Sequence, residues 1–188
     1  SMTFNKDVDR DVYMLNEYRN FRDNAEKIGM RHFLEVFNSA VIDLSIEEMG
    51  QYVNDCILKT LAGQISKEKP LFLKIAYNGP KAMDELASYD PGNLVIGILG
   101  GGKGTSRDCF ELLKQACKYG ARVALFGRKV NLSENQLTIV SVMRRVIENN
   151  LESREAVKLY HDELNKINIK PDRDIETDSE ITDKTLTM

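Results

Sequence analysis

The sequence lacks several features that would assign it to a membrane or a secretory pathway. In its 188 residues no apolar run approaches the length of a membrane-spanning helix, and no stretch resembles a signal peptide. Cysteine is scarce: Cys56, Cys109 and Cys117 match no metal-binding spacing, so we expect no metal. Because an odd cysteine count without a secretion signal indicates a reducing compartment, we expect a cytoplasmic protein.

The sequence also lacks an excess of charge of either sign. Its 26 basic and 29 acidic residues give a net charge of −3. Such a balance provides no general attraction to nucleic acid or to an anionic membrane, and we expect neither as a partner. The hydrophobic share of 42% is enough for a folded domain with a core. A small molecule or another protein is the expected partner.

Helical and extended patterns alternate along most of the chain. Apolar residues at three- and four-residue steps predict helices over residues 7–28, 45–65, 105–119 and 151–167, with a further helix from Ser133. Short apolar runs predict strands that begin near residues 32, 71, 94 and 122. This alternation is typical of consecutive βα units and a parallel sheet, and hence of an α/β fold. A complete (β/α)8 barrel needs about 250 residues, so four units indicate half of a TIM barrel or a small open sheet, such as a flavodoxin-like one.

The composition changes near the C-terminus. From Lys170 onward the chain is polar, carries many acidic residues and shows no periodicity. We therefore expect residues 1–169 to form the partial barrel. Residues 170–188 are expected to be a tail, either disordered or laid over the surface.

The segment Leu71–Gly79, LFLKIAYNG, contains a lysine within an otherwise apolar strand pattern. Such a run predicts a strand buried on both faces, which would point Lys74 into the core. Burying an ammonium without a partner costs several kcal/mol or favours the neutral amine, which is the nucleophile that Schiff-base chemistry requires. Alternatively, Lys74 reaches solvent or pairs with a carboxylate.

Two loops that follow predicted strands carry glycine. The first, Gly100–Ser106, opens a helix, where free backbone N–H groups and the helix dipole attract anions. It narrowly misses a P-loop, because Gly104 stands where a Ser or Thr would hold magnesium. The alternative interpretation is a tight turn. The second loop, Phe126–Asn131, contains Gly127 and Arg128. Two such loops fit the phosphate site that barrels build after strands seven and eight.

Three segments together resemble a known family. Leu73–Tyr77 (LKIAY), Ile98–Gly102 (ILGGG) and Leu125–Asn131 (LFGRKVN) resemble the C-terminal half of class I, Schiff-base aldolases of the group containing deoxyribose-phosphate, tagatose-bisphosphate and archaeal-type fructose-bisphosphate aldolases. The resemblance implies a lyase without a cofactor, in which Lys74 forms the imine. It also implies that a substrate phosphate is held by Gly100, Gly101, Gly102, Gly127 and Arg128.

A proton carrier is the part that the resemblance does not supply. The strands that provide the family's acid/base aspartate have no counterpart here. Glu35 is the one carboxylate predicted to face inward from the neighbouring strand, either as a proton carrier or as a structural partner of Lys74. Two hypotheses follow: an aldolase-like enzyme acting on a phosphorylated sugar or ketone, or a non-catalytic α/β domain that binds a phosphate-bearing ligand or a protein partner.

A half barrel would leave one face of its sheet uncovered. That face is predicted to carry Phe33, Glu35, Phe37, Phe72, Lys74, Ala76, Val95 and Leu99. A single chain tolerates neither an uncovered apolar face nor two open sheet edges well, so we expect a homodimer with two-fold symmetry. A doubly wound sheet would instead cover both faces with its own helices and could stay monomeric.

Overall fold

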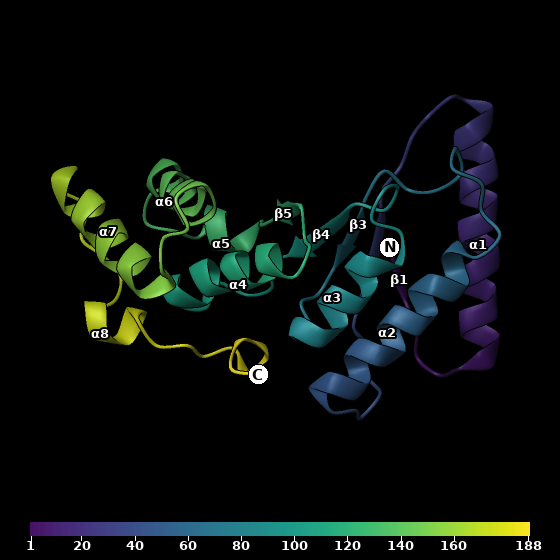
Figure 1. Ribbon diagram of the computed structural model, residues 1–188, viewed down its shortest axis with the longest axis horizontal. Helices are drawn as coiled ribbons and strands as arrows, with labels where there is room; N and C mark the ends of the chain where they lie inside the picture. The colour runs from purple at the N-terminus through teal and green to yellow at the C-terminus, as the bar shows by residue number, and fades with distance from the viewer. The chain divides into compact units, whose positions relative to one another are not determined.

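The computed structural model describes all 188 residues and divides the chain into two compact units (Figure 1). The first unit comprises Ser1–Ile98 with Gly120–Val123, and the second comprises Leu99–Tyr119 with Ala124–Met188. No helix in the structure combines the length and the apolar character needed to cross a bilayer.

The sheet contains five strands whose spatial order follows the chain. The strands are β1 (Met2–Thr3), β2 (Leu34–Phe37), β3 (Leu73–Ile75), β4 (Ile96–Leu99) and β5 (Val123–Leu125), in the order β1-β2-β3-β4-β5. Neighbouring strands from β1 to β4 pair in parallel. The predicted α/β class with a parallel sheet is therefore confirmed, and β1 is an additional short edge strand. The order nowhere reverses, unlike that of a sheet with a topological switch point.

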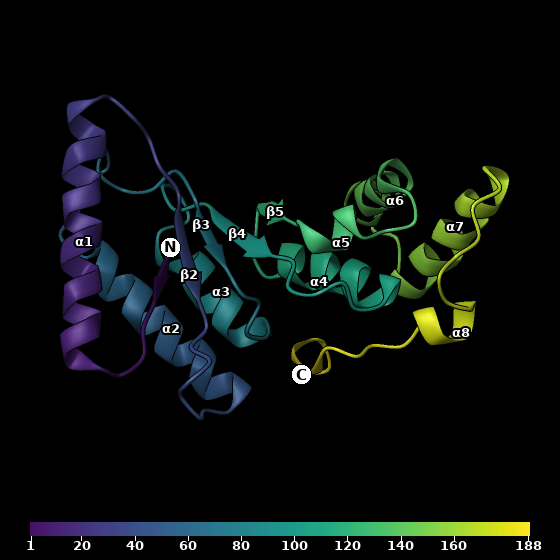
Figure 2. The same cartoon turned by 180° about the vertical axis from the view of Figure 1, so that it is seen from behind.

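Three helices belong to the first unit: α1 (Val8–Lys27), α2 (Ile46–Leu61) and α3 (Pro80–Tyr89). Ser45 and Glu48 form the predicted capping box at the start of α2. Four apolar residues at four-residue steps, Met49, Val53, Ile57 and Leu61, form the buried face of α2. Helices α2 and α3 lie side by side across one face of the strands (Figure 1). In the opposite view, the strands lie in front of these two helices (Figure 2).

The two faces of the strands differ in burial. Leu34, Val36, Leu73 and Ile75 are at most 3% exposed, whereas Phe33 and Phe37 on the other face are 49% and 41% exposed. The prediction that Leu71–Gly79 forms a strand buried on both faces is therefore wrong. Helices α2 and α3 cover only one face, so the alternate residues of β3, Lys74 among them, lie on a partly open face.

The second unit is mainly helical. It contains α4 (Ser106–Lys118), α5 (Arg128–Asn131), α6 (Gln136–Glu148), α7 (Ser153–Lys166), α8 (Ile175–Asp178) and the 3₁₀ helix η1 (Lys184–Leu186). Its core joins α4, α6 and α7 around Phe110, Val142 and Tyr160. Helix α6 begins three residues after the predicted start because the side chain of Asn135, rather than Ser133, caps it.

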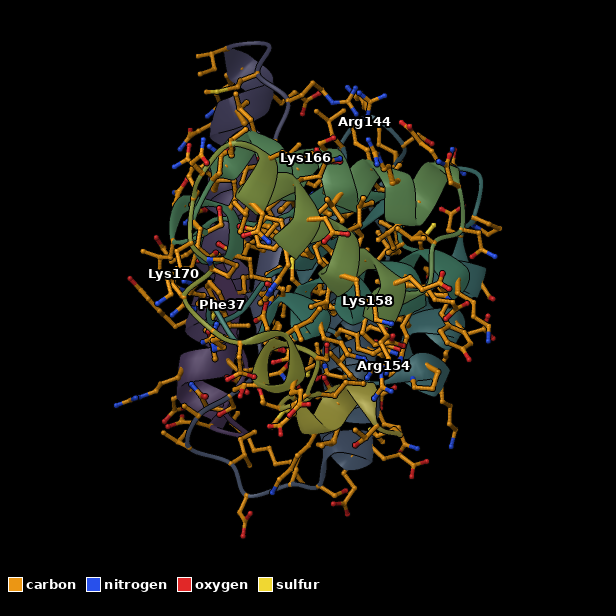
Figure 3. The ribbon with its side chains drawn as sticks, turned by 90° about the vertical axis from the view of Figure 1, so that its left-hand side faces the viewer. Phe37, Arg144, Arg154, Lys158, Lys166 and Lys170 are labelled. Atoms are coloured by element: carbon orange, nitrogen blue, oxygen red, sulfur yellow. The ribbon has the colours of Figure 1, made fainter.

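The C-terminal segment, residues 170–188, is folded onto the second unit. Figure 3 shows it beside α7, with Lys170 at its start. The hydroxyl of Thr105 donates to the carbonyl of Glu180 (2.7 Å), and Gln115 donates to the carbonyl of Leu186 (3.0 Å). Of the two arrangements expected for this segment, the structure therefore has the one laid over the surface.

A buried carboxylate of α4 fixes the segment. Asp108, 1% exposed, accepts hydrogen bonds from the backbone N–H groups of Thr105, Thr182 and Asp183 and from the Thr182 hydroxyl. Burial by itself raises the pKa of Asp108, but these hydrogen bonds outweigh it, so the pKa lies below its usual value of 3.8. One side chain thus caps α4 and holds the C-terminal segment.

We expect Asp108→Ala to destabilise the protein by about 2 to 4 kcal/mol, because it leaves several buried N–H groups without an acceptor. Urea denaturation measures this cost, and Asp162→Ala, which removes an exposed carboxylate from α7, is the control. Since the folded pKa of Asp108 is lowered, its contribution is complete above pH 4 and declines as the pH falls through the folded value. Equal stability of the two variants would contradict this role.

Candidate functional site

Lys74 and Glu35 form an ion pair on the open face of the strands. They are cross-strand partners in the parallel register of β2 and β3, and Lys74 Nζ lies 2.6 Å from Glu35 Oε1. The side chains are 26% and 17% exposed, so the pair is partly shielded rather than buried. The structure thus brings the two predicted catalytic residues together. An ammonium in this arrangement has a carboxylate within proton-transfer distance.

Aromatic and amide side chains accompany this pair in the first unit. The rings of Phe33 and Phe72 stack with centroids 4.9 Å apart. Each lies two residues before Glu35 or Lys74, and therefore on the same face of the strands. Asn38 and Asn78, at the carboxyl ends of the two strands, exchange reciprocal amide hydrogen bonds of 2.7 and 3.1 Å. Sequence reasoning did not single out these amides, although each lies at the carboxyl end of a predicted strand, where ligands of parallel sheets bind.

In the second unit, the glycine loop leads into a capped helix. Gly101 and Gly104 have φ values of 64° and 61°, the left-handed region that glycine adopts without strain. Gly100 is buried against Phe126, where a Cβ would approach the ring within 2.9 Å. Thr105 and Asp108 form a capping box at the start of the 13-residue helix α4. The loop therefore has the strand–glycine–helix geometry that the sequence predicts.

The second predicted loop presents its basic residues differently from the expectation. Arg128 is exposed, whereas the neighbouring Lys129 is only 5% exposed. Lys129 Nζ donates to the carbonyl of Lys103 at 3.3 Å and has no carboxylate within 4.0 Å. Gly127 is exposed and a Cβ there would contact nothing, so close packing does not require glycine at this position. The buried cation next to the glycine loop is thus Lys129.

A small cavity with room for about one water molecule, partly open to solvent, joins these elements within the second unit. Its lining includes Gly104 and Ser106 at the start of α4 and the basic residues Lys103, Lys129 and Arg173. We call it the α4 cavity. Three cations around a helix N-terminus favour an anion. The residues predicted to hold phosphate, Gly100, Gly101, Gly102, Gly127 and Arg128, do not line this cavity. Other residues of the same two loops do, namely Lys103–Ser106 of the first and Lys129 of the second.

Two further residues of the α4 cavity limit its chemistry. Burial raises the pKa of Cys109 to about 12, so its thiol stays protonated near neutral pH and is a poor nucleophile. Glu134 brings a negative charge, but its carboxylate accepts hydrogen bonds from the Tyr160 hydroxyl and the Asp172 N–H, both at 3.0 Å. The cavity is therefore suited to binding an anion rather than to thiol catalysis.

Lys129 and Arg173 are the residues that sequence reasoning missed. Adjacent positions of a helix point about 100° apart, so only one of Arg128 and Lys129 can face the glycine loop, and the sequence does not say which. Arg173 lies in a segment without periodicity, whose path cannot be deduced from the sequence pattern.

A groove of the second unit carries the basic residues Arg107, Arg154 and Lys158. The last two lie on one face of α7 (Figure 3).

Comparison with known proteins assigns no family: no protein-family model matches the sequence, and no curated protein sequence matches it. The resemblance to class I aldolases therefore stays a prediction.

Proposed function

We propose that this protein binds a phosphate-bearing small molecule through the α4 cavity. The observation that carries the proposal is Lys129, a buried cation without a carboxylate partner, next to the glycine loop and the N-terminus of α4. An ammonium in such surroundings is costly unless an anion accompanies it. A phosphate offers several acceptor oxygens to Lys129, to Lys103 and to backbone N–H groups at once.

We expect Lys129→Met to weaken the binding of inorganic phosphate by about 1 to 3 kcal/mol, the usual worth of a charge-assisted hydrogen bond. Methionine keeps the length of the side chain, so the core is little disturbed. Arg128→Met is the matched control, since Arg128 is exposed on the same short helix. Calorimetric titration at constant ionic strength measures both variants. If Arg128→Met alone weakens binding, the sequence-based assignment of Arg128 is correct and that of Lys129 is not.

A second candidate function is the aldolase chemistry that the resemblance implies, and the Lys74–Glu35 pair favours it. Imine formation requires a neutral amine to attack a carbonyl carbon and a proton donor to remove the oxygen as water. Transfer of a proton from Lys74 to Glu35 over their 2.6 Å contact would create both groups in one step. In this proposal the substrate is a sugar or ketone phosphate, Lys74 is the nucleophile and Glu35 carries the proton.

Borohydride reduction tests the imine. With a panel of aldehyde and ketone phosphates, we expect covalent labelling at Lys74, located by mass spectrometry of peptides. Glu35→Gln should slow labelling by about 10²-fold or more, because general acid–base help typically contributes 10²- to 10⁴-fold. Lys81, an exposed lysine of the same unit, is the internal control for non-specific reduction. Equal labelling of Lys74 and Lys81 would remove the basis for an imine at Lys74.

Assembly follows from the open face of the strands. The consecutive strand order and the burial of one face beneath helices support the proposal that the chain is half of a TIM barrel. In a complete barrel the open face would point inward, yet here Phe33 and Phe37 are 49% and 41% exposed. A second copy related by a two-fold axis would cover the same residues on both chains. We therefore include a homodimer in the proposal.

We expect sedimentation equilibrium at micromolar concentration to give the mass of a dimer, about twice 21.4 kDa. Substituting Phe33 by Lys should shift the equilibrium to the monomer, since it places like charges opposite each other across a two-fold interface. Phe21→Lys, which changes an exposed phenylalanine of α1, is the matched control. A wild-type protein that sediments as a compact monomer would exclude this assembly.

A further inference from the structure

The C-terminal segment places two carboxylates on the donors of the α4 cavity. Asp172 Oδ2 lies 2.6 Å from Lys103 Nζ. Asp178 Oδ1 accepts a 2.9 Å hydrogen bond from the Ser106 N–H at the start of α4 and lies 3.7 Å from Arg173 Nη1. Lys103, Ser106 and Arg173 all line the cavity. The carboxylates of the segment thus engage Lys103, the N-terminal N–H of Ser106 and Arg173, which belongs to the segment itself.

Asp178 is held in this position by its surroundings. It is 1% exposed, and its other oxygen lies 2.9 Å from Nε2 of the buried His161. Its side chain sits where an anion bound at the N-terminus of α4 would sit, with an N–H donor and an arginine beside it. A carboxylate with these partners is an internal substitute for a bound anion.

The rest of the segment is fastened by a reciprocal contact. Asp108 of α4 accepts from the N–H groups of Thr182 and Asp183, while Asp178 of the segment accepts from α4. These bonds join the segment to the same first turn of α4 that lines the cavity. A ligand bound at the N-terminus of α4 would therefore act directly on the contacts that hold the segment.

We infer that the C-terminal segment is an autoinhibitory strap, whose Asp172 and Asp178 compete with the phosphate group of a ligand for the α4 cavity. The inference rests on the proposed phosphate-binding function. A phosphate that enters must take over Lys103 and the Ser106 N–H from these carboxylates, because like charges on shared donors repel. Ligand binding and attachment of the segment then oppose each other, and the opposition is reciprocal.

Removing one carboxylate at a time tests the strap in the full-length protein. Asp172→Asn is the primary variant, because its side chain is 59% exposed and its loss does not threaten folding. Asp178→Asn is the second, and keeps an acceptor for the Ser106 N–H. Glu163→Gln is the matched control, since it also removes one negative charge from an ion pair of the second unit, that with Lys166. Inorganic phosphate is the probe, titrated at constant ionic strength.

The expected result is a phosphate affinity about threefold to tenfold tighter in Asp172→Asn and Asp178→Asn than in the wild type, the size of one screened charge interaction at a few ångströms. Glu163→Gln should stay within twofold of the wild type. Saturating phosphate should also speed amide hydrogen exchange at Thr182 and Asp183 several-fold, because displacement of the segment exposes these N–H groups.

Failure of the strap and failure of the phosphate site give different results. One outcome overturns the strap but leaves the site standing. In it, phosphate binds the wild type and Lys129→Met weakens that binding, while both aspartate variants bind phosphate as the wild type does and amide exchange at Thr182 and Asp183 is unchanged. If phosphate binds none of the variants, both are overturned. Binding that appears only after Asp172→Asn or Asp178→Asn supports both. Should Asp178→Asn not fold, Asp172→Asn decides alone.

Discussion

The burial of one face of the parallel strands beneath helices determines where the Lys74–Glu35 ion pair of the first unit lies. Leu73 and Ile75 are at most 3% exposed, and alternation then forces the residue between them onto the opposite face. The parallel register sets Glu35 beside Lys74 as its cross-strand partner. A shift of one residue would bury the lysine beneath the helices and expose two core residues. The ion pair is therefore a consequence of the hydrophobic pattern on the other face.

The second unit depends on a comparable constraint at one helix terminus. The first turn of α4 leaves backbone N–H groups without intrahelical partners, and carboxylates from two parts of the chain satisfy them. Asp108 bonds the Thr105 N–H from within the helix, and Asp178 bonds the Ser106 N–H from the C-terminal segment. The same donors would attract the phosphate of the proposed ligand, so structural capping and the proposed binding draw on one set of groups. The C-terminal segment is therefore part of the candidate site.

The sequence predicts the fold better than the site. Periodicity and caps locate the long helices and four of the five strands, because burial of an apolar stripe and satisfaction of helix ends are local properties. The burial of the Lys74 strand could not be predicted, since a short apolar run does not reveal how many faces are covered. Whether Lys129 or Arg128 faces the glycine loop depends on the rotation of a four-residue helix about its axis. The path of residues 170–188 depends on the hydrogen bonds from Thr182 to Asp108 and from Ser106 to Asp178, each of which joins residues more than 70 positions apart.

In the proposed imine chemistry, the partial exposure of the Lys74–Glu35 pair would connect assembly with reactivity. At 26% and 17% side-chain exposure, water still stabilises the ammonium and the carboxylate, and a charged amine does not attack a carbonyl. The neutral pair differs from the charged one only by movement of a proton between Nζ and Oε1. Excluding water penalises the two charges more than the neutral groups, so covering this face would favour the neutral pair that the proposed imine chemistry requires. In the proposed dimer, the second copy would supply that cover, and the apolar rings of Phe33 and Phe72 would keep water from the pair.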